Sequence, residues 1–454
     1  MSFDAVRSPA APAPKRIDTG IRWEVARGGR MQANGTLVVE EPTLVLLAQS
    51  DDDAKVREDL VRIRLGGQVC RRFQNQKGVL EVHWQGLKVH EVALLAHGPF
   101  ETEFNIREFY FPSTFAFKVR FESSRILSKD RFSDFSSELV TLDPPTIEGA
   151  EDTDRGAAAQ LIATGKAMAE SMGLVQGYMT PHRALALQTR IVSALRDRTP
   201  FSVVRLGDGE GRLLGYPTFF TDVEVLIQVL YYHFGPTSVD EMRVRRPEDW
   251  LEHYAGLLKD MISESVKSAD VLGLPVANFY SRQPVAAYFG HAAYACAMFH
   301  GLSLARRKDP ESFFGTNMFQ ILAAEGLLLR EAAQAAEAVC MVGPWPITEA
   351  VGQALGRADL EHIQVPGHAT WRGESGHGQF PDLYLYVEDQ IVRRGRLGGQ
   401  LFLIGAGILG KYYCDLIRKR GGVALDVGSV LDSWAGRGLP YALENVEVTL
   451  EKYG

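Results

Sequence analysis

The chain has 454 residues, of which 46% are hydrophobic and 23% charged, and its formal net charge is −7 at pH 7. This length predicts two or three domains, because one core of ordinary size cannot hold so many residues. The negative balance excludes a general nucleic-acid-binding protein, which needs a basic surface for phosphate contacts. No run of the sequence approaches the roughly 18 apolar residues of a membrane span, so we expect no transmembrane segment.

The first third of the chain has the composition of β-structure. Residues 1–20 contain Ala and Pro but no continuous apolar stretch, so we expect a disordered tail, no signal peptide and a cytoplasmic protein. Residues 21–145 carry β-branched and aromatic runs broken by Gly, Pro, Asp and Asn, which predicts a β-rich accessory domain resembling an antiparallel sandwich. Pro144, Pro145 and the acidic stretch after them mark a boundary, and the chain then becomes Ala-rich, so residues 146–180 are predicted to form a linker and a helix.

Residues 181–454 alternate short apolar strands with helices, which predicts an α/β domain with a Rossmann-like, mostly parallel sheet and helices on both faces. The expected helices cover 156–172 and 182–197, and the expected strands lie near 201–206, 269–274, 338–343, 361–365, 400–405 and 422–426. Ligands of open α/β sheets bind beyond the carboxyl ends of the strands. Asp208, after the first strand, and Gly405, after the fifth, are therefore expected to share one crevice.

An apolar run ends at Gly207, Asp208, Gly209 and Glu210, which form a D-x-E pair flanked by glycine. In an extended segment residues i and i+2 point to the same side, so we expect both carboxylates to converge on one point. Two carboxylates suit Mg²⁺ or Mn²⁺, which take their remaining ligands from water and phosphate oxygens. The alternative is a turn carrying solvated acids. Arg205 would either face a diphosphate or neutralise the two acids.

The run RLGDGE, together with the later ALDVGSVLD, resembles the glycosyltransferases of the GT-D fold over roughly residues 180–454. The resemblance implies transfer of a sugar from a nucleotide-diphosphate donor, a UDP-sugar first of all, to a glycan or glycoconjugate. It also implies that Asp208 and Glu210 act in catalysis by holding Mn²⁺ or Mg²⁺ on the donor diphosphate. The D-[IV]-G element of the family falls on residues 426–428. Ser429 stands where the family often has His, which leaves any role of that His open.

A second glycine-rich loop, with Gly405, Gly407 and Gly410, follows a predicted strand, and the next strand ends at Asp426. By pattern alone this is the dinucleotide fingerprint, so an NAD- or S-adenosylmethionine-dependent enzyme is an alternative. Its place close to the end of the sequence counts against a complete dinucleotide domain. In the glycosyltransferase interpretation, Gly405 and Gly407 contact the donor, and Asp426 binds ribose or sugar hydroxyls or acts as a base. Alternatively, the glycines only permit close packing.

Other polar residues have weaker signals. His368, Glu374 and His377 lie in a Gly-rich loop and are candidates for a general base, although a solvated surface loop is the better interpretation of each. Asn317 precedes a predicted helix and is interpreted first as a helix cap and second as a ligand contact. A third class of function, a non-catalytic carbohydrate-binding protein that uses the β-rich domain, also stays open. The sequence leaves the oligomeric state open, a homo-oligomer included.

Overall fold

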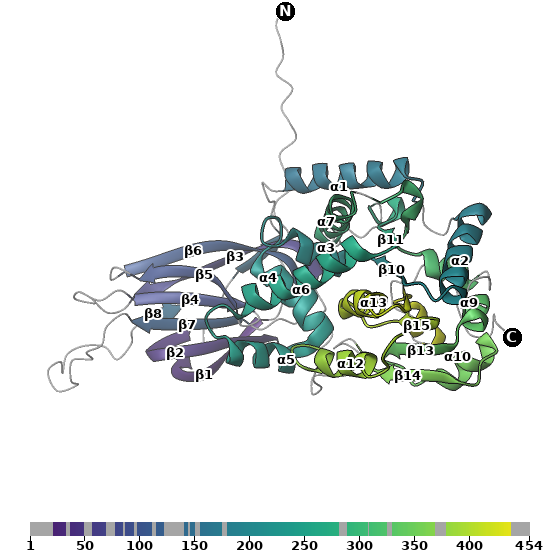
Figure 1. Cartoon of the computed structure of the whole chain (residues 1–454). Helices are drawn as coiled ribbons and strands as arrows, with labels where there is room; N and C mark the ends of the chain where they lie inside the picture. The colour runs from purple at the N-terminus through teal and green to yellow at the C-terminus, as the bar shows by residue number, and fades with distance from the viewer. Residues whose placement is uncertain are drawn as a thin grey trace, which may run out of the picture. The chain divides into compact units, whose positions relative to one another are not determined.

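The computed structural model describes residues 21–436 apart from residues 33–36, 50–56, 70–77, 85–86, 95–97, 111–114, 122–139, 144–145, 150–154, 175–178, 281–287, 307, 325–328 and 368–377. The chain divides near Arg155 into two compact units (Figure 1). The expected tail at residues 1–20 lies outside the described residues. Within the described part, no helix is both long and apolar enough to cross a membrane.

The first unit is an antiparallel sheet of nine strands. The strands are β1 (Ile21–Met31), β2 (Leu37–Gln49), β3 (Arg57–Val69), β4 (Gly78–Trp84), β5 (Leu87–Leu94), β6 (Gly98–Tyr110), β7 (Phe115–Phe121), β8 (Val140–Leu142) and β9 (Thr146–Gly149). Their order is β5-β4-β7-β2-β8-β3-β6, with β1 paired to β2 and β9 paired to β3. On β3, Ile63 and Leu65 are buried while Arg64 points outward and donates to Glu103 at 2.9 Å. This alternation is what a half-buried strand requires, and the expected antiparallel β-rich region is confirmed. Its predicted end at residue 145 is too early, because β9 pairs with β3 in the stretch that was expected to be a linker.

The second unit is built on a seven-stranded parallel sheet with the order β12-β11-β10-β16-β15-β13-β14. Its strands are β10 (Phe201–Arg205), β11 (Val271–Leu274), β12 (Phe313–Gly315), β13 (Ala338–Gly343), β14 (Leu360–Gln364), β15 (Gln400–Ile404) and β16 (Val423–Asp426). The Rossmann-like fold class is confirmed, and all six expected strands are present. The sequence prediction missed β12, whose three residues are too few to show a periodic pattern.

Helices surround this sheet. They are α1 (Arg155–Ser171), α2 (Pro181–Arg196), α3 (Asp208–Gly215), α4 (Asp222–Val225), α5 (Tyr232–Arg245), α6 (Trp250–Ser268), α7 (Tyr288–Leu304), α8 (Met318–Ala324), α9 (Leu329–Ala335), α10 (Thr348–Leu355), α12 (Leu383–Val392), α13 (Leu409–Lys419) and α14 (Val430–Trp434). The start of α2 follows from its sequence: Thr180 accepts a hydrogen bond from the Arg183 amide, and Pro181 occupies the first turn.

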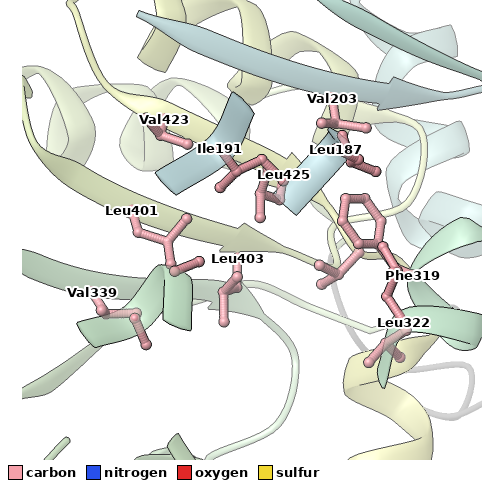
Figure 2. Close-up of a cluster of buried hydrophobic side chains, with 14 of the residues drawn as sticks. Leu187, Ile191, Val203, Phe319, Leu322, Val339, Leu401, Leu403, Val423 and Leu425 are labelled. Atoms are coloured by element: carbon pink, nitrogen blue, oxygen red, sulfur yellow. The ribbon is translucent and has the colours of Figure 1, made fainter. Parts of the chain in front are cut away.

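One face of the parallel sheet forms a continuous apolar core with helices α2 and α8 (Figure 2). Leu187 and Ile191 lie one turn apart on α2, so they face the same strands, and both are fully buried. Leu403 on β15 and Phe319 on α8 are also fully buried in this cluster. Each such side chain contributes roughly 1.5–3 kcal/mol by leaving water, so this packing fixes how the strand ends are placed.

The crossovers of the sheet diverge between β15 and β13. From β15 the chain passes through α13 to β16, toward the centre, whereas from β13 it passes through α10 to β14 at the outer edge. Ligands of open α/β sheets bind at such a switch point, beyond the carboxyl ends of the strands. The loop 405–408 after β15 lies at this point.

Candidate functional site

Asp208 and Glu210 lie in the first turn of a helix, not in an extended segment. Strand β10 ends at Arg205, and α3 begins at Asp208. The side chain of Asp208 is 53% exposed and accepts a hydrogen bond from Arg212 Nη1 at 3.0 Å. Glu210 is buried, with only 8% of its side chain exposed. Because residues two apart on a helix point in different directions, the expectation that both carboxylates converge on one point is wrong.

Glu210 belongs to the interior of the site. Its Oε2 accepts a hydrogen bond from the Gly207 amide at 2.8 Å, as in half of a capping box, where the glutamate reaches back to the residue before the helix. Its Oε1 lies 2.8 Å from Lys411 Nζ. The glycines have packing roles here: a Cβ at Gly207 would lie 3.2 Å from Glu210 Oε2, and a Cβ at Gly209 would lie 3.1 Å from His233 Nε2.

Lys411 joins the two acidic motifs that lie far apart in the sequence. Its ammonium group lies 2.8 Å from Glu210 Oε1, 3.2 Å from Asp426 Oδ2 and 3.2 Å from the Gly407 carbonyl oxygen. Burial lowers the pKa of Lys411, but Asp426 and Glu210 more than offset this, so the pKa is raised and the side chain stays charged. The sequence analysis missed this residue, although its place directly after the glycine loop was a signal.

Asp426 is 1% exposed and has protein partners on both carboxylate oxygens. Oδ2 accepts from the Arg205 backbone N–H at 3.1 Å and contacts Lys411, while Oδ1 lies 3.6 Å from Arg205 Nη2. Arg205, Glu210, Lys411 and Asp426 thus form a buried charge network in which two cations balance two anions. We refer to these four residues as the charge network.

Arg205 reaches sideways along the carboxyl edge of the sheet. Its Nη1 donates to the Thr316 carbonyl oxygen, after β12, at 2.8 Å, while Nη2 lies 3.6 Å from Oδ1 of Asp426, the last residue of β16. Gly428 leaves the space that the Arg205 side chain occupies. It has a φ of +55°, and a Cβ at this position would lie 1.6 Å from Arg205 Nη2. The glycine of the D-V-G element is therefore required both by its backbone conformation and by the guanidinium group that passes over it.

The loop after β15 has the predicted strand–glycine–helix form, since α13 begins at Leu409 and β16 ends at Asp426. A Cβ at Gly405 would lie 3.0 Å from the Gly428 carbonyl oxygen, so this glycine allows the loops after β15 and β16 to approach each other. Gly407 has a φ of +58°, which favours glycine by itself. The packing explanation of these glycines is therefore supported, and the structure brings their loop next to the charge network through Lys411.

Two further contacts flank the charge network. Ser429 accepts a hydrogen bond from Gln320 Nε2 at 3.1 Å, so it links the loop after β16 to α8. Trp345, in the loop after β13, donates from Nε1 to Asp432 Oδ1 at 2.7 Å. Burial raises the pKa of Asp432 to about 6, although Trp345 and Arg205 oppose the shift.

Of the acidic groups described here, Asp208 has the exposed carboxylate. The described residues contain no cluster of three or more His, Cys, Asp and Glu side chains placed to hold a metal ion. Asp208 is an exposed carboxylate at the sheet edge, and a single protein carboxylate with phosphate oxygens is a normal donor set for Mg²⁺. Glu210 does not share that point, because Lys411 and the Gly207 amide occupy its oxygens. The loop with His368, Glu374 and His377 lies outside the described residues.

A family model described as a GT-D fold-like domain matches residues 182–330. No curated protein matches the chain significantly. Among solved structures, two domains of unknown function 1792 are 14% and 13% identical, each covering 57% of this chain and 88% of its own, with TM-scores of 0.32 and 0.30. One of them is described as having a distinct glycosyltransferase fold. A xylan-binding module, CBM15, is 14% identical over 31% of this chain and 99% of its own, with a TM-score of 0.21.

Structural likenesses at TM-scores this low carry no weight for function. The family match carries more, because it covers the D-x-E motif, β10 and α3. It lies within the segment of the sequence resemblance, but the glycine loop and the D-V-G element fall outside it. A GT-D-like domain supports glycosyltransferase activity in general. The protein therefore carries a GT-D-like domain, matched over residues 182–330, at the start of its parallel-sheet unit.

Proposed function

We propose that this protein is a glycosyltransferase that takes a sugar from a nucleotide-diphosphate donor, a UDP-sugar first of all, and transfers it to a glycan or glycoconjugate. The observation that carries the proposal is the charge network. It ties the D-x-E segment, the glycine loop and the D-V-G element together at the carboxyl edge of the parallel sheet. That edge is where α/β sheets bind nucleotides.

In this proposal Asp208 holds Mn²⁺ or Mg²⁺ against the donor diphosphate. A bound divalent cation offsets the negative charge that develops on the leaving nucleoside diphosphate. Asp208 suits this role because its carboxylate is exposed and lies at the end of the first strand. Arg212, which is 2% exposed, donates from Nη1 to Asp208 Oδ2 at 3.0 Å and so limits the rotamers of Asp208.

The other residues of the site position the loops around the donor. Glu210 and Asp426 hold Lys411 and Arg205, and through them the loops after β10, β15 and β16. This replaces the earlier expectation that Asp426 binds a sugar or ribose hydroxyl or acts as a base, since its oxygens already have protein partners. Arg205, Gly405 and Gly407 border the place proposed for the diphosphate.

The same contacts weigh against the main rival, an NAD- or S-adenosylmethionine-dependent enzyme. In the dinucleotide fingerprint the acid at the end of the second strand accepts hydrogen bonds from ribose hydroxyls. Here that acid is Asp426, which is 1% exposed and contacts Arg205 and Lys411. A ribose could reach it only by displacing a buried cation, at a cost of several kcal/mol.

Calorimetric titration with UDP-glucose, with and without Mn²⁺, tests the proposal. We expect Mn²⁺ to tighten binding at least about tenfold in the native chain and to have little effect in Asp208→Asn. Asp240→Asn is the matched control, because Asp240 is 69% exposed and lies outside the site. Retained Mn²⁺ dependence in Asp208→Asn would refute the metal assignment. Saturable binding of NAD or S-adenosylmethionine, with no binding of any nucleotide sugar, would favour the rival enzyme class.

The proposal also assigns roles to the two units. All donor-site residues belong to the parallel-sheet unit, so we assign donor binding and chemistry to that unit. The antiparallel unit would then bind the acceptor or mediate oligomerisation. A non-catalytic carbohydrate-binding protein would differ in one measurement, since it would neither transfer nor hydrolyse the sugar of any nucleotide donor.

A further inference from the structure

Asn317 is a buried carboxamide next to the charge network that the proposed chemistry leaves unused. It follows β12 directly and precedes α8, and only 2% of the residue is exposed. Its neighbour Thr316 is the residue whose carbonyl oxygen accepts from Arg205 Nη1 at 2.8 Å. Asn317 therefore lies at the carboxyl edge of the sheet. It directly follows the residue that contacts Arg205, whose guanidinium group borders the position proposed for the diphosphate.

Neither polar atom of this side chain has a hydrogen-bond partner among the residues that the structure describes. A carboxamide offers two N–H donors and one carbonyl acceptor, and a buried polar group without partners costs roughly 1–3 kcal/mol. Asn317 precedes α8 as the sequence predicted, but its side chain does not cap the helix. A purely structural position would be served better by an apolar residue.

The oxygen of this amide packs against the end of β12. Asn317 Oδ1 lies so close to Gly315 that a Cβ there would approach it to 2.7 Å. On the next turn of the chain, Gln320 also has an unpartnered Oε1 within the described part, while its Nε2 donates to Ser429 at 3.1 Å. Two carboxamides with unused hydrogen-bonding capacity thus lie between β12 and the loop after β16.

We infer that Asn317, supported by Gln320, forms a carboxamide subsite that reads an uncharged part of the donor nucleotide. The inference rests on the proposed function, because it takes the diphosphate to lie near Arg205. The ligand group must present a hydrogen-bond donor and an acceptor side by side, since that arrangement satisfies both ends of a carboxamide. Two parts of a UDP-sugar have this chemistry: the imide edge of the uracil base and a pair of neighbouring sugar hydroxyls.

A contact of this kind confers specificity more than raw affinity. Once a ligand satisfies the amide, any analogue that lacks the matching group leaves buried polar atoms unpaired and is rejected. The charge network and Asp208 would hold the diphosphate of every donor alike. Asn317 is therefore a specificity-determining residue for the donor rather than part of the machinery that neutralises its phosphates.

The test separates a ligand contact from a structural hydrogen bond by measuring stability and binding in the same variants. Asn317→Leu and Asn317→Ala remove the amide, the first with a similar branched shape. Gln379→Met is the matched control, because Gln379 is a buried carboxamide, 8% exposed, whose Nε2 donates to the Pro366 and Ala406 carbonyl oxygens at 3.3 Å. Melting temperatures of the ligand-free chains are compared with affinities for UDP-glucose, UDP and inorganic pyrophosphate.

We expect Asn317→Leu to melt at or above the native temperature and Gln379→Met to melt lower, because only the second loses hydrogen bonds within the protein. We expect Asn317→Leu and Asn317→Ala to bind UDP-glucose about tenfold more weakly while binding pyrophosphate as the native chain does. Equal weakening for UDP and UDP-glucose assigns the subsite to the base. Weakening for UDP-glucose alone assigns it to the sugar.

Two results would overturn the inference while leaving the proposed function intact. The first is a melting temperature of Asn317→Leu lower by about 3 °C or more, as in the control, which means that the amide has an internal partner. The second is native affinity for UDP-glucose in both Asn317 variants. If the native chain binds pyrophosphate but no nucleotide or nucleotide sugar, the proposed function itself fails and the inference falls with it.

Discussion

Replacing Lys411 by Met should destabilise the parallel-sheet unit more than any exposed charge substitution. The ammonium group contacts Glu210 at 2.8 Å and Asp426 at 3.2 Å, and the side chains of all three are no more than 8% exposed. Without it, Asp426 keeps Arg205, whereas among the described residues Glu210 keeps the Gly207 amide alone. Removing one partner of a buried ion pair costs roughly 3–5 kcal/mol, and we expect about 3 kcal/mol because that amide contact survives.

Equilibrium unfolding in urea measures this loss. The matched control is Lys267→Met, whose lysine pairs with Glu264 at 2.7 Å on the surface, with exposed fractions of 50% and 59%. Exposed pairs of this kind contribute at most about 1 kcal/mol. The double variant Lys411→Met with Glu210→Gln should recover most of the loss, because it removes the uncompensated carboxylate together with the cation.

Two outcomes of these unfolding measurements would contradict the prediction. A loss in Lys411→Met no larger than in the surface control would mean that water reaches Glu210 and that the network is not buried. A double variant as unstable as the sum of the two single variants would show no coupling between the residues. Because the pKa of Lys411 is raised, its contribution should persist at neutral pH and disappear only in strongly alkaline solution, above the pKa of the folded state.

Three further outcomes follow. Because burial raises the pKa of Asp432 from about 3.9 in the unfolded chain to about 6, the free energy of unfolding should fall as pH rises from 4 to 6. Asp432→Asn, which still accepts from Trp345, should remove this fall of about 3 kcal/mol. A native-like pH profile of stability in the variant would contradict the assignment. Gly428→Ala should lower the stability by more than the roughly 1 kcal/mol that its positive φ costs, because the added methyl group collides with Arg205 Nη2. In an Arg205→Ala background, calorimetric melting should show only the cost of the backbone conformation. Equal losses of stability in both backgrounds would exclude the collision. A chain that begins at Arg155 should still bind UDP-glucose, as measured by titration, and a folded but non-binding chain would show that the antiparallel unit completes the site.

The fold was predictable because its signals are local. Six strands and the helices α1 and α2 have apolar periodicity strong enough to be read from a single sequence. The geometry at Asp208 was not predicted correctly, although a signal existed. Glycine followed three residues later by glutamate is compatible with a helix start, and the Glu210 contact to the Gly207 amide is what makes α3 begin there.

The charge network could not be read from the sequence in the same way. Its members come from β10, α3, α13 and β16, and only the sheet order brings Arg205 next to Asp426. Local pattern gives no information about which strand lies beside which. Lys411 was overlooked for a related reason, since a lysine on a helix is normally solvated, and its burial depends on two acids from distant parts of the chain.

The place of β16 in the sheet constrains how this unit is made in the cell. β16 is the last strand among the described residues, yet it lies between β10 and β15 at the centre. During synthesis β10 emerges long before its partner, so one of its edges stays open while more than half of the unit is translated. The sheet therefore cannot close in the order in which it is made. Ribosomal arrest or premature termination before Val423 would leave the facing edges of β10 and β15 unpaired in the middle of the sheet. Unpaired edges of this kind promote aggregation, so we expect such a truncated chain to need a chaperone.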